Sequence, residues 1–98
     1  MYRIIAKRTL RTFWEKNPQS EQALKTWYHI VKNADWTNSN EVKKVFLSAS
    51  IVGDNRIVFN IKGNHFRLVV KFNFERKWVF IRFVGTHKDY DKIDVKTI

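Results

Sequence analysis

Cysteine is absent from the 98-residue sequence, and acidic residues and histidines are few. Without cysteine the chain has no disulfide bond, no thiol nucleophile and no thiolate metal ligand, which suits a reducing cytoplasm. The three histidines, His29, His65 and His87, lie far apart and lack the spacing of metal ligands. We therefore expect no metal ion and no other cofactor.

Long apolar runs are absent as well. No run approaches the roughly 20 residues that a membrane-spanning helix needs. Residues 1–10 carry charges on both sides of a very short apolar stretch, unlike a signal peptide. We expect a cytoplasmic protein that makes no contact with a membrane.

The scarcity of acidic residues leaves a large positive charge. Nine Asp and Glu face 19 Lys and Arg, for a net charge of +10. Such a surplus indicates a polyanionic partner, most often nucleic acid, sometimes an acidic protein or a membrane surface. The basic residues are spread through segments that we expect to fold, so charge alone barely separates a binding face from an ordinary solvated surface.

Large apolar side chains, in contrast, are plentiful. Hydrophobic residues make up 44% of the chain and aromatic residues 15%, with four Trp and eight Phe. This content is enough for a core and argues against disorder in spite of the high charge. The length suits a single core, and no repeat or linker divides it. We predict one domain spanning residues 1–98.

The first half of the chain shows mainly helical periodicity. We expect a short strand at residues 2–6, followed by helices at 10–17, 18–33 and 37–46. Thr9 is the predicted cap of the first helix and Asn17 that of the second, with Pro18 at the first helical position. The residues expected to face inward from the last of these helices are Val42, Val45 and Phe46.

The second half changes to the alternation of β-strands. We expect strands at residues 48–52, 56–62, 65–74 and 78–84, separated by turns at 53–55, 63–64 and 75–77. Thr86 and Asp89 form a capping box that predicts a short helix after the last strand. The predicted fold class is α+β: an N-terminal strand and helices on one face of a mainly antiparallel sheet, with a short C-terminal helix.

Strand alternation sorts these side chains into two faces of the sheet. One face is apolar, including Val79, Ile81 and Phe83 of the last strand, and should be covered by the helices. The other face, which should also carry Val84, collects Arg56, Asn60, Lys62, Arg67, Lys71 and Arg82 and no carboxylate from these strands. An ordinary solvent face mixes signs, since like charges across strands are destabilising. We therefore favour a phosphate-binding face, where Trp78, Phe80 or His65 can stack on unpaired bases.

The stretch VGTHKDYDKI places His87 and Tyr90 three residues apart on one side of the terminal helix. The helix follows directly from the strand of Arg82, so both rings should lie at the rim of the cationic face. Histidine is the usual proton carrier near neutral pH. The alternative is that Tyr90 only packs the helix onto the sheet and His87 is solvated. Asp91 is expected to balance an Arg or Lys rather than to bind a metal.

Together these groups suggest metal-free cleavage of RNA, in which a 2′-hydroxyl attacks the adjacent phosphate. Arg67 and Arg82 suit stabilisation of the charge that develops on the phosphate, because a guanidinium presents a fork to phosphate oxygens. His87 and Tyr90 are the candidates for proton transfer. The pattern leaves open which of them is the acid and which the base.

The residues VFNIKGNHFRLVVKFNF and VFIRFVGTHKDYDKI, together with the helical half at 8–36, resemble the HigB-type toxins of bacterial type II toxin–antitoxin systems, within the RelE/ParE superfamily. The resemblance implies a RelE-like fold and an mRNA endoribonuclease, in many relatives one that acts on mRNA in the ribosomal A site. It implies a HigA-type helix-turn-helix antitoxin as partner, with operator DNA bound only through that antitoxin.

Carried over by position, the resemblance points to Asn60, Asn64, Arg67, Arg82, His87 and Tyr90. The combined expectation assigns catalysis to Arg67, Arg82, His87 and Tyr90 and RNA binding to Arg56, Asn60, Lys62, Asn64 and Lys71, with no metal ligand. Two alternatives remain: a nonenzymatic RNA- or ribosome-binding module, and a toxin that inhibits a protein target, as ParE-like relatives do.

Overall fold

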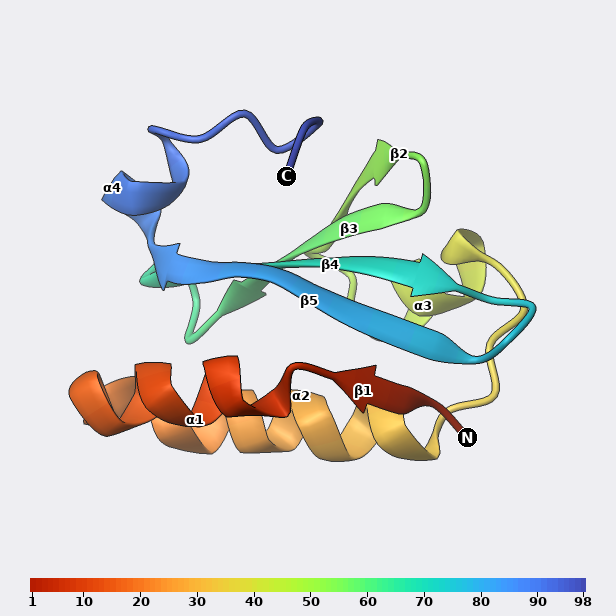
Figure 1. Ribbon diagram of the computed structural model, residues 1–98, viewed down its shortest axis with the longest axis horizontal. Helices are drawn as coiled ribbons and strands as arrows, with labels where there is room; N and C mark the ends of the chain where they lie inside the picture. The colour runs from red at the N-terminus through yellow and green to blue at the C-terminus, as the bar shows by residue number, and fades with distance from the viewer.

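The computed structural model describes residues 1–98 and consists of a five-stranded sheet with helices packed against it (Figure 1). The elements in chain order are β1 (Arg3–Ile5), α1 (Lys7–Lys16), a 3₁₀ turn (Pro18–Ser20), α2 (Glu21–Asn33), α3 (Ser39–Val45), β2 (Ser50–Gly53), β3 (Arg56–Ile61), β4 (Phe66–Asn73), β5 (Trp78–Thr86) and α4 (His87–Tyr90). None of the helices is long and apolar enough to cross a membrane.

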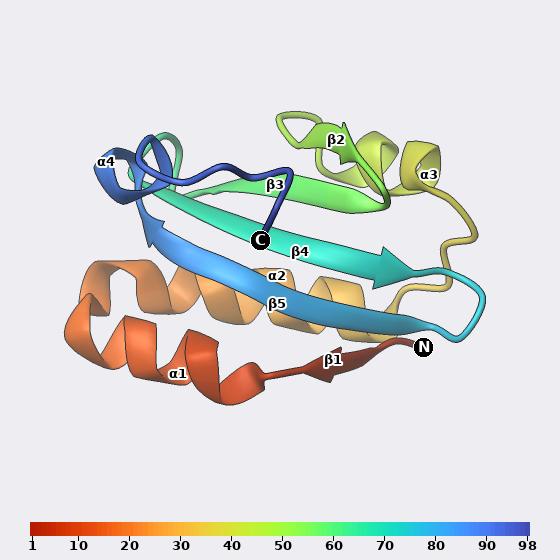
Figure 2. The same ribbon diagram turned by 45° about the horizontal axis from the view of Figure 1, so that its top comes forward.

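The sheet order is β1-β5-β4-β3-β2. Strands β2 to β5 form an antiparallel meander, while β1 lies parallel to β5 at the edge. Helices α1 and α2 lie side by side on one face of the sheet (Figures 1 and 2). The predicted α+β class, with a mainly antiparallel sheet and a short C-terminal helix, is confirmed.

The core lies between this helical layer and the sheet. Alternate residues of β3 and β4, such as Phe59 and Leu68, are almost fully buried. They meet Leu24, Trp27 and Val31 of α2, which are equally buried, as the predicted apolar face requires. The rings of Trp27 and Phe59 pack edge to face with their centroids 5.5 Å apart. Because the helical layer buries this side of the sheet, we look for a functional site on the opposite side.

The helix starts in the first half differ from the prediction. Helix α1 begins at Lys7, directly after Ala6 in a left-handed conformation (φ 74°), and Thr9 is already inside the first turn. Asn17 ends α1 instead of capping α2, because both its backbone and its side-chain N–H donate to the Phe13 carbonyl. Pro18 therefore starts a 3₁₀ turn rather than α2 itself. The predicted roles of Thr9 and Asn17 as N-caps are wrong.

Helix α3 is shorter than predicted and has a different cap. The Asn38 side chain accepts the Glu41 N–H at 3.1 Å and starts the helix. Val42 is fully buried and Phe46 packs on the core, as expected, but Val45 is 52% exposed. The inward orientation predicted for Val45 is wrong, since only one side of so short a helix meets the core.

A β-bulge in β5 reverses the predicted faces of two residues. In the pairing with β4, Val69 faces Phe83 and Val70 faces Ile81, so Arg82 is one residue in excess. From Phe83 onward the alternation is shifted by one: Val84 packs on the core, and Phe83 lies on the face away from α1 and α2. The placement of Phe83 inside and Val84 outside was wrong for this reason.

The face of the sheet away from α1 and α2, here called the open face, is partly covered by the C-terminal tail, residues 91–98 (Figures 1 and 2). Val58 and Val69 lie on this face, outside the main core, yet both are buried. Ile93, Val95 and Ile98 of the tail are partly buried, and Arg56 Nε donates to the Ile98 carbonyl at 2.9 Å. The tail thus covers the β3–β4 part of the open face and leaves the β5 part accessible.

Candidate functional site

The end of the open face where the β3–β4 turn meets α4 carries most of the predicted site, and we call it the α4 end. The Thr86 hydroxyl accepts the Asp89 N–H at 3.1 Å, which confirms the predicted cap of α4. The His87 N–H donates to the His65 carbonyl at 3.2 Å, so the start of α4 is fixed to the start of β4. Both imidazoles are exposed at this end.

His87 is held by Asp91 one helical turn later. The distance from His87 Nδ1 to Asp91 Oδ2 is 3.1 Å, and the two side chains are 51% and 58% exposed. The carboxylate therefore pairs with an imidazole, not with an Arg or Lys as expected. A carboxylate that accepts the Nδ1 proton leaves Nε2 free to exchange a proton with a ligand.

Tyr90 lies over the open face and not in the core. Its ring centroid is 6.4 Å from that of Phe83 at an interplanar angle of 51°, and the ring is half-buried. The ring of Tyr90 thus packs α4 onto the sheet, as the alternative in the sequence analysis proposed. Its hydroxyl makes no hydrogen bond within the protein and can contact a ligand.

Gly85 makes this arrangement possible. A Cβ atom at this position would lie 2.6 Å from Cζ of Phe83 and 3.3 Å from Cβ of Asp89. Only a residue without a side chain lets the Phe83 ring and the first turn of α4 lie over the end of β5 together.

Arg67 is the one buried charged residue of the protein, with only 9% of its surface exposed. It pairs with Asn60 of β3 and Gly85 of β5, at the base of α4. Its guanidinium donates to the Asn64 carbonyl, the Asn64 Oδ1 and the Phe66 carbonyl at 3.2–3.3 Å. All three acceptors are neutral, so the α4 end holds a positive charge that no carboxylate compensates.

The other predicted RNA-binding residues near this end differ in how free their polar groups are to contact RNA. Lys62 is exposed in the β3–β4 turn. The amide of Asn60 donates to the Ser48 carbonyl at 3.3 Å and so holds the segment before β2. Asn64 is exposed but already accepts two hydrogen bonds from Arg67.

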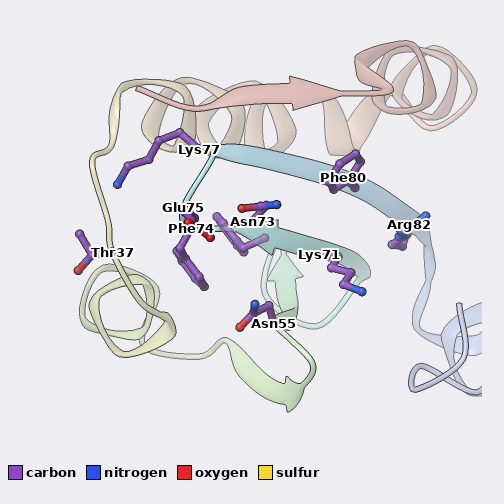
Figure 3. Close-up of a pocket in the computed structure, with 10 residues that line it drawn as sticks. Thr37, Asn55, Lys71, Asn73, Phe74, Glu75, Lys77, Phe80 and Arg82 are labelled. Carbon is purple, nitrogen blue, oxygen red and sulfur yellow. The ribbon is translucent and has the colours of Figure 1, made fainter.

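Further along the open face, a groove of about 890 Å³ lies between the α3 side and β5. Figure 3 shows Lys71, Phe80 and Arg82 on neighbouring strands at one end of the groove and Thr37 and Lys77 at the other. We call the whole part of the open face that contains this groove the groove end. Arg82 is five residues before His87 on an extended strand, about 16 Å away.

The cations at the groove end have an acidic partner that the strand pattern did not show. Asp54, in the β2–β3 turn, accepts from Arg56 Nη1 at 3.0 Å and from Lys71 Nζ at 3.1 Å. The hydrogen bond and charge of Lys71, followed by those of Arg56, hold the pKa of Asp54 below its usual value. The strands contribute no carboxylate to this face, as predicted, but the turn between β2 and β3 supplies one at this end.

The nine predicted site residues thus form two groups instead of one. The α4 end brings together Asn60, Lys62, Asn64, Arg67, His87 and Tyr90, and the rest of the open face carries Arg56, Lys71 and Arg82. Sequence reasoning placed His65 on the cationic face as a stacking residue and Asp91 as a counter-ion of an Arg or Lys, but it did not predict that both contact His87. The antiparallel pairing of the segments that carry His65 and His87, and the four-residue spacing of His87 and Asp91, were the signals that could have found them.

Comparison of the amino-acid sequence with known proteins identifies the family of this chain. Residues 20–93 match the family described as HigB_toxin, RelE-like toxic component of a toxin-antitoxin system. A protein named mRNA interferase toxin HigB, from Escherichia coli K12, is 32% identical over 90 residues, covering 90% of this chain and 86% of the relative. An mRNA interferase HigB from E. coli O6:H1 is 27% identical over 92 residues, covering 92% and 89%.

Proposed function

This chain belongs to the HigB family of RelE-like toxins, and on that premise we propose that it is the toxin of a toxin–antitoxin system that cleaves mRNA as an endoribonuclease. The relatives carry the name mRNA interferase. The observation that carries the proposal for this chain is the pairing of His87 with Asp91 beside the uncompensated charge of Arg67.

The proposed reaction is attack by the 2′-hydroxyl of one ribose on the adjacent phosphorus. His87 Nε2 accepts the 2′ proton, since Asp91 holds the other ring nitrogen. The bond from phosphorus to the 5′ oxygen breaks, and Tyr90 or a water that it orients supplies the proton to that oxygen. The products are a 2′,3′-cyclic phosphate and a 5′-hydroxyl.

Arg67 stabilises the negative charge that develops on the phosphate in this proposal. Its guanidinium is held by neutral carbonyl and amide oxygens only, so its positive charge stays available to an anion. Its low exposure means that the phosphate approaches it at the edge of the β3–β4 turn, next to Asn64. Arg82, further along β5, is assigned to holding the RNA strand instead of to the reacting phosphate.

The partners follow from the family and from charge. A toxin of such a system is held inactive by an antitoxin, which we propose to be of the HigA helix-turn-helix type and to carry an acidic segment that neutralises the open face. We further propose that the mRNA is cleaved on the ribosome in the cytoplasm, where a net charge of +10 favours binding to RNA.

The test incubates purified protein with ribosome-free mRNA in EDTA, and separately with mRNA on ribosomes in a buffer that keeps the Mg²⁺ that ribosomes need. Fragments ending in 2′,3′-cyclic phosphate or 3′-phosphate are expected, with faster cleavage when ribosomes are present. RNA binding without cleavage in either condition would replace the proposal with the nonenzymatic binding module. Cleavage of ribosome-free mRNA that occurs in Mg²⁺ but stops in EDTA would contradict the proposed mechanism.

A further inference from the structure

The outer side of β5 carries two adjacent aromatic rings with a cation at each end, the first cation coming from the turn just before the strand. The Arg76 guanidinium carbon lies 5.3 Å from the Trp78 ring centroid, and that of Arg82 lies 5.5 Å from the Phe80 centroid. Between them, the Trp78 and Phe80 rings meet edge to face with their centroids 6.0 Å apart. We call these four residues the β5 row.

The β5 row belongs to the open face and not to the core. Trp78 pairs with Asn73 of β4 and Phe80 with Lys71, which are both on the open face. Neither ring is part of the hydrophobic core, and both are half-buried, while the two arginines are exposed. Folding alone therefore does not account for two large aromatic rings at these positions.

The groove runs directly beside this row. Phe80 and Arg82 form part of its wall, and Lys71 and Asn73 reach it from β4 (Figure 3). Glu75 is its one acidic lining residue. Its lining therefore combines hydrogen-bond donors, positive charge and an aromatic surface, which together fit a nucleotide better than an apolar ligand.

The surroundings connect this region to the α4 end. The C-terminal tail lies over β3 and β4, and β5 leads directly from the row to α4 (Figures 1 and 2). Phe80 is seven residues before His87, about 23 Å along an extended strand. An RNA strand bound at His87 thus reaches the row within a few nucleotides.

We propose that the β5 row and the groove bind unpaired nucleotides of the substrate RNA a few positions away from the cleaved bond. Bases stack on Trp78 and Phe80, while Arg76, Arg82 and Lys71 contact phosphates. Because paired bases are stacked inside a duplex, this surface selects single-stranded RNA. This inference rests on the proposed function, but it concerns substrate binding and not the chemical step.

The test measures the dissociation constant for a fluorescent 2′-O-methyl oligonucleotide, which binds but lacks the attacking hydroxyl. Trp78→Leu and Phe80→Leu keep an apolar side chain and remove the ring. Each should weaken binding about 5- to 150-fold, the range for loss of one base–aromatic stack. With a cleavable RNA the loss should appear in KM, and a duplex of the same sequence should show no such difference.

Tyr28→Leu is the matched control. Tyr28 also lies beneath a cation, with Lys7 Nζ 4.6 Å from its ring centroid, but it belongs to α2 on the other side of the molecule. Its loss should leave RNA affinity unchanged. Thermal unfolding of all three variants verifies that each is folded.

The outcomes separate this inference from the proposed function. If the wild-type protein cleaves RNA and the folded Trp78 and Phe80 variants bind within twofold of it, the inference is wrong and the function stands. If the wild type binds but never cleaves and the variants bind more weakly, the function is wrong and the binding surface stands. Unchanged RNA affinity with weakened antitoxin binding would assign the row to a protein partner and overturn the inference.

Discussion

The two ends of the open face differ in how their positive charge is compensated. At the α4 end, Arg67 is buried among neutral acceptors, and the carboxylate of Asp91 is engaged with His87. At the groove end, Lys71 pairs with Asp54 and Lys77 with Asp35, 3.4 Å away. The comparison teaches that a nearly uniform basic pattern in sequence contains one place suited to stabilising a transition state and another suited to holding a strand.

The strongest way to break this comparison is His87→Ala. If proton transfer occurs at the α4 end, the rate of a single turnover should fall about 10²- to 10⁴-fold with little change in RNA affinity. His29→Ala is the control, because His29 is exposed on α2 and remote from the open face. A His87 variant that cleaves as fast as the wild type would remove the basis for a catalytic end.

Arg67→Lys tests whether the uncompensated charge needs a guanidinium. Lysine keeps the charge but cannot donate to both oxygens of Asn64 and to a phosphate with the same fork. We expect a loss of about 100-fold in single-turnover rate, measured beside thermal unfolding. Arg11→Lys, an exposed change on α1, provides the reference. Equal rates for both variants would show that Arg67 only supports the β3–β4 turn.

Tyr90→Phe separates packing from chemistry at the same position. The substituted ring still packs on Phe83, so the free energy of unfolding should be unchanged. If the hydroxyl takes part in proton transfer, the cleavage rate should fall about tenfold, less than the usual 10²- to 10⁴-fold of acid–base catalysis, because water can supply part of the proton transfer. Full activity of this variant together with low activity of Tyr90→Leu would leave Tyr90 as a packing residue only.

Asp54→Asn sharpens the comparison from the groove end, with the smallest effect. The pKa of Asp54 is lowered in the folded protein, so its ion pairs stabilise the fold above the unfolded pKa and this contribution is lost as pH falls through the folded pKa. The variant should therefore lose part of the acid dependence of its melting temperature. Because Lys71 and Arg56 are released, RNA affinity should rise slightly at low salt, and a fall would contradict the assignment.

The sequence predicted the fold well because strand alternation and turn residues are local signals. The β2–β3 turn, where Asp54 and Asn55 both have positive φ, lies within the predicted stretch at 53–55. The face of Phe83 was not predictable in the same way, since parity cannot detect one excess residue that is visible only in pairing with β4.

The candidate site was predicted by residue type but not by arrangement. His87 and Tyr90 lie at the rim of the open face as the helix signal indicated. The burial of Arg67 and the covering of Val58 and Val69 depend on long-range packing that includes the tail. Residues 91–98 have neither helical nor strand periodicity, so nothing local indicated where they lie.

The excess residue in β5 exchanges the two faces of the strand for all residues that follow it. Up to Ile81 the odd-numbered residues of β5 face the core, and after Arg82 the even-numbered residues do. A regular ladder that kept all the residues would pair Arg82 with Val69 and would turn every later side chain to the opposite surface, with Phe83 in the core and Val84 in solvent. Deleting Arg82 would instead leave the pairing of Phe83 with Val69 and the faces of all later residues unchanged, so the bulge lets the strand carry one additional cation without reversing the residues that follow.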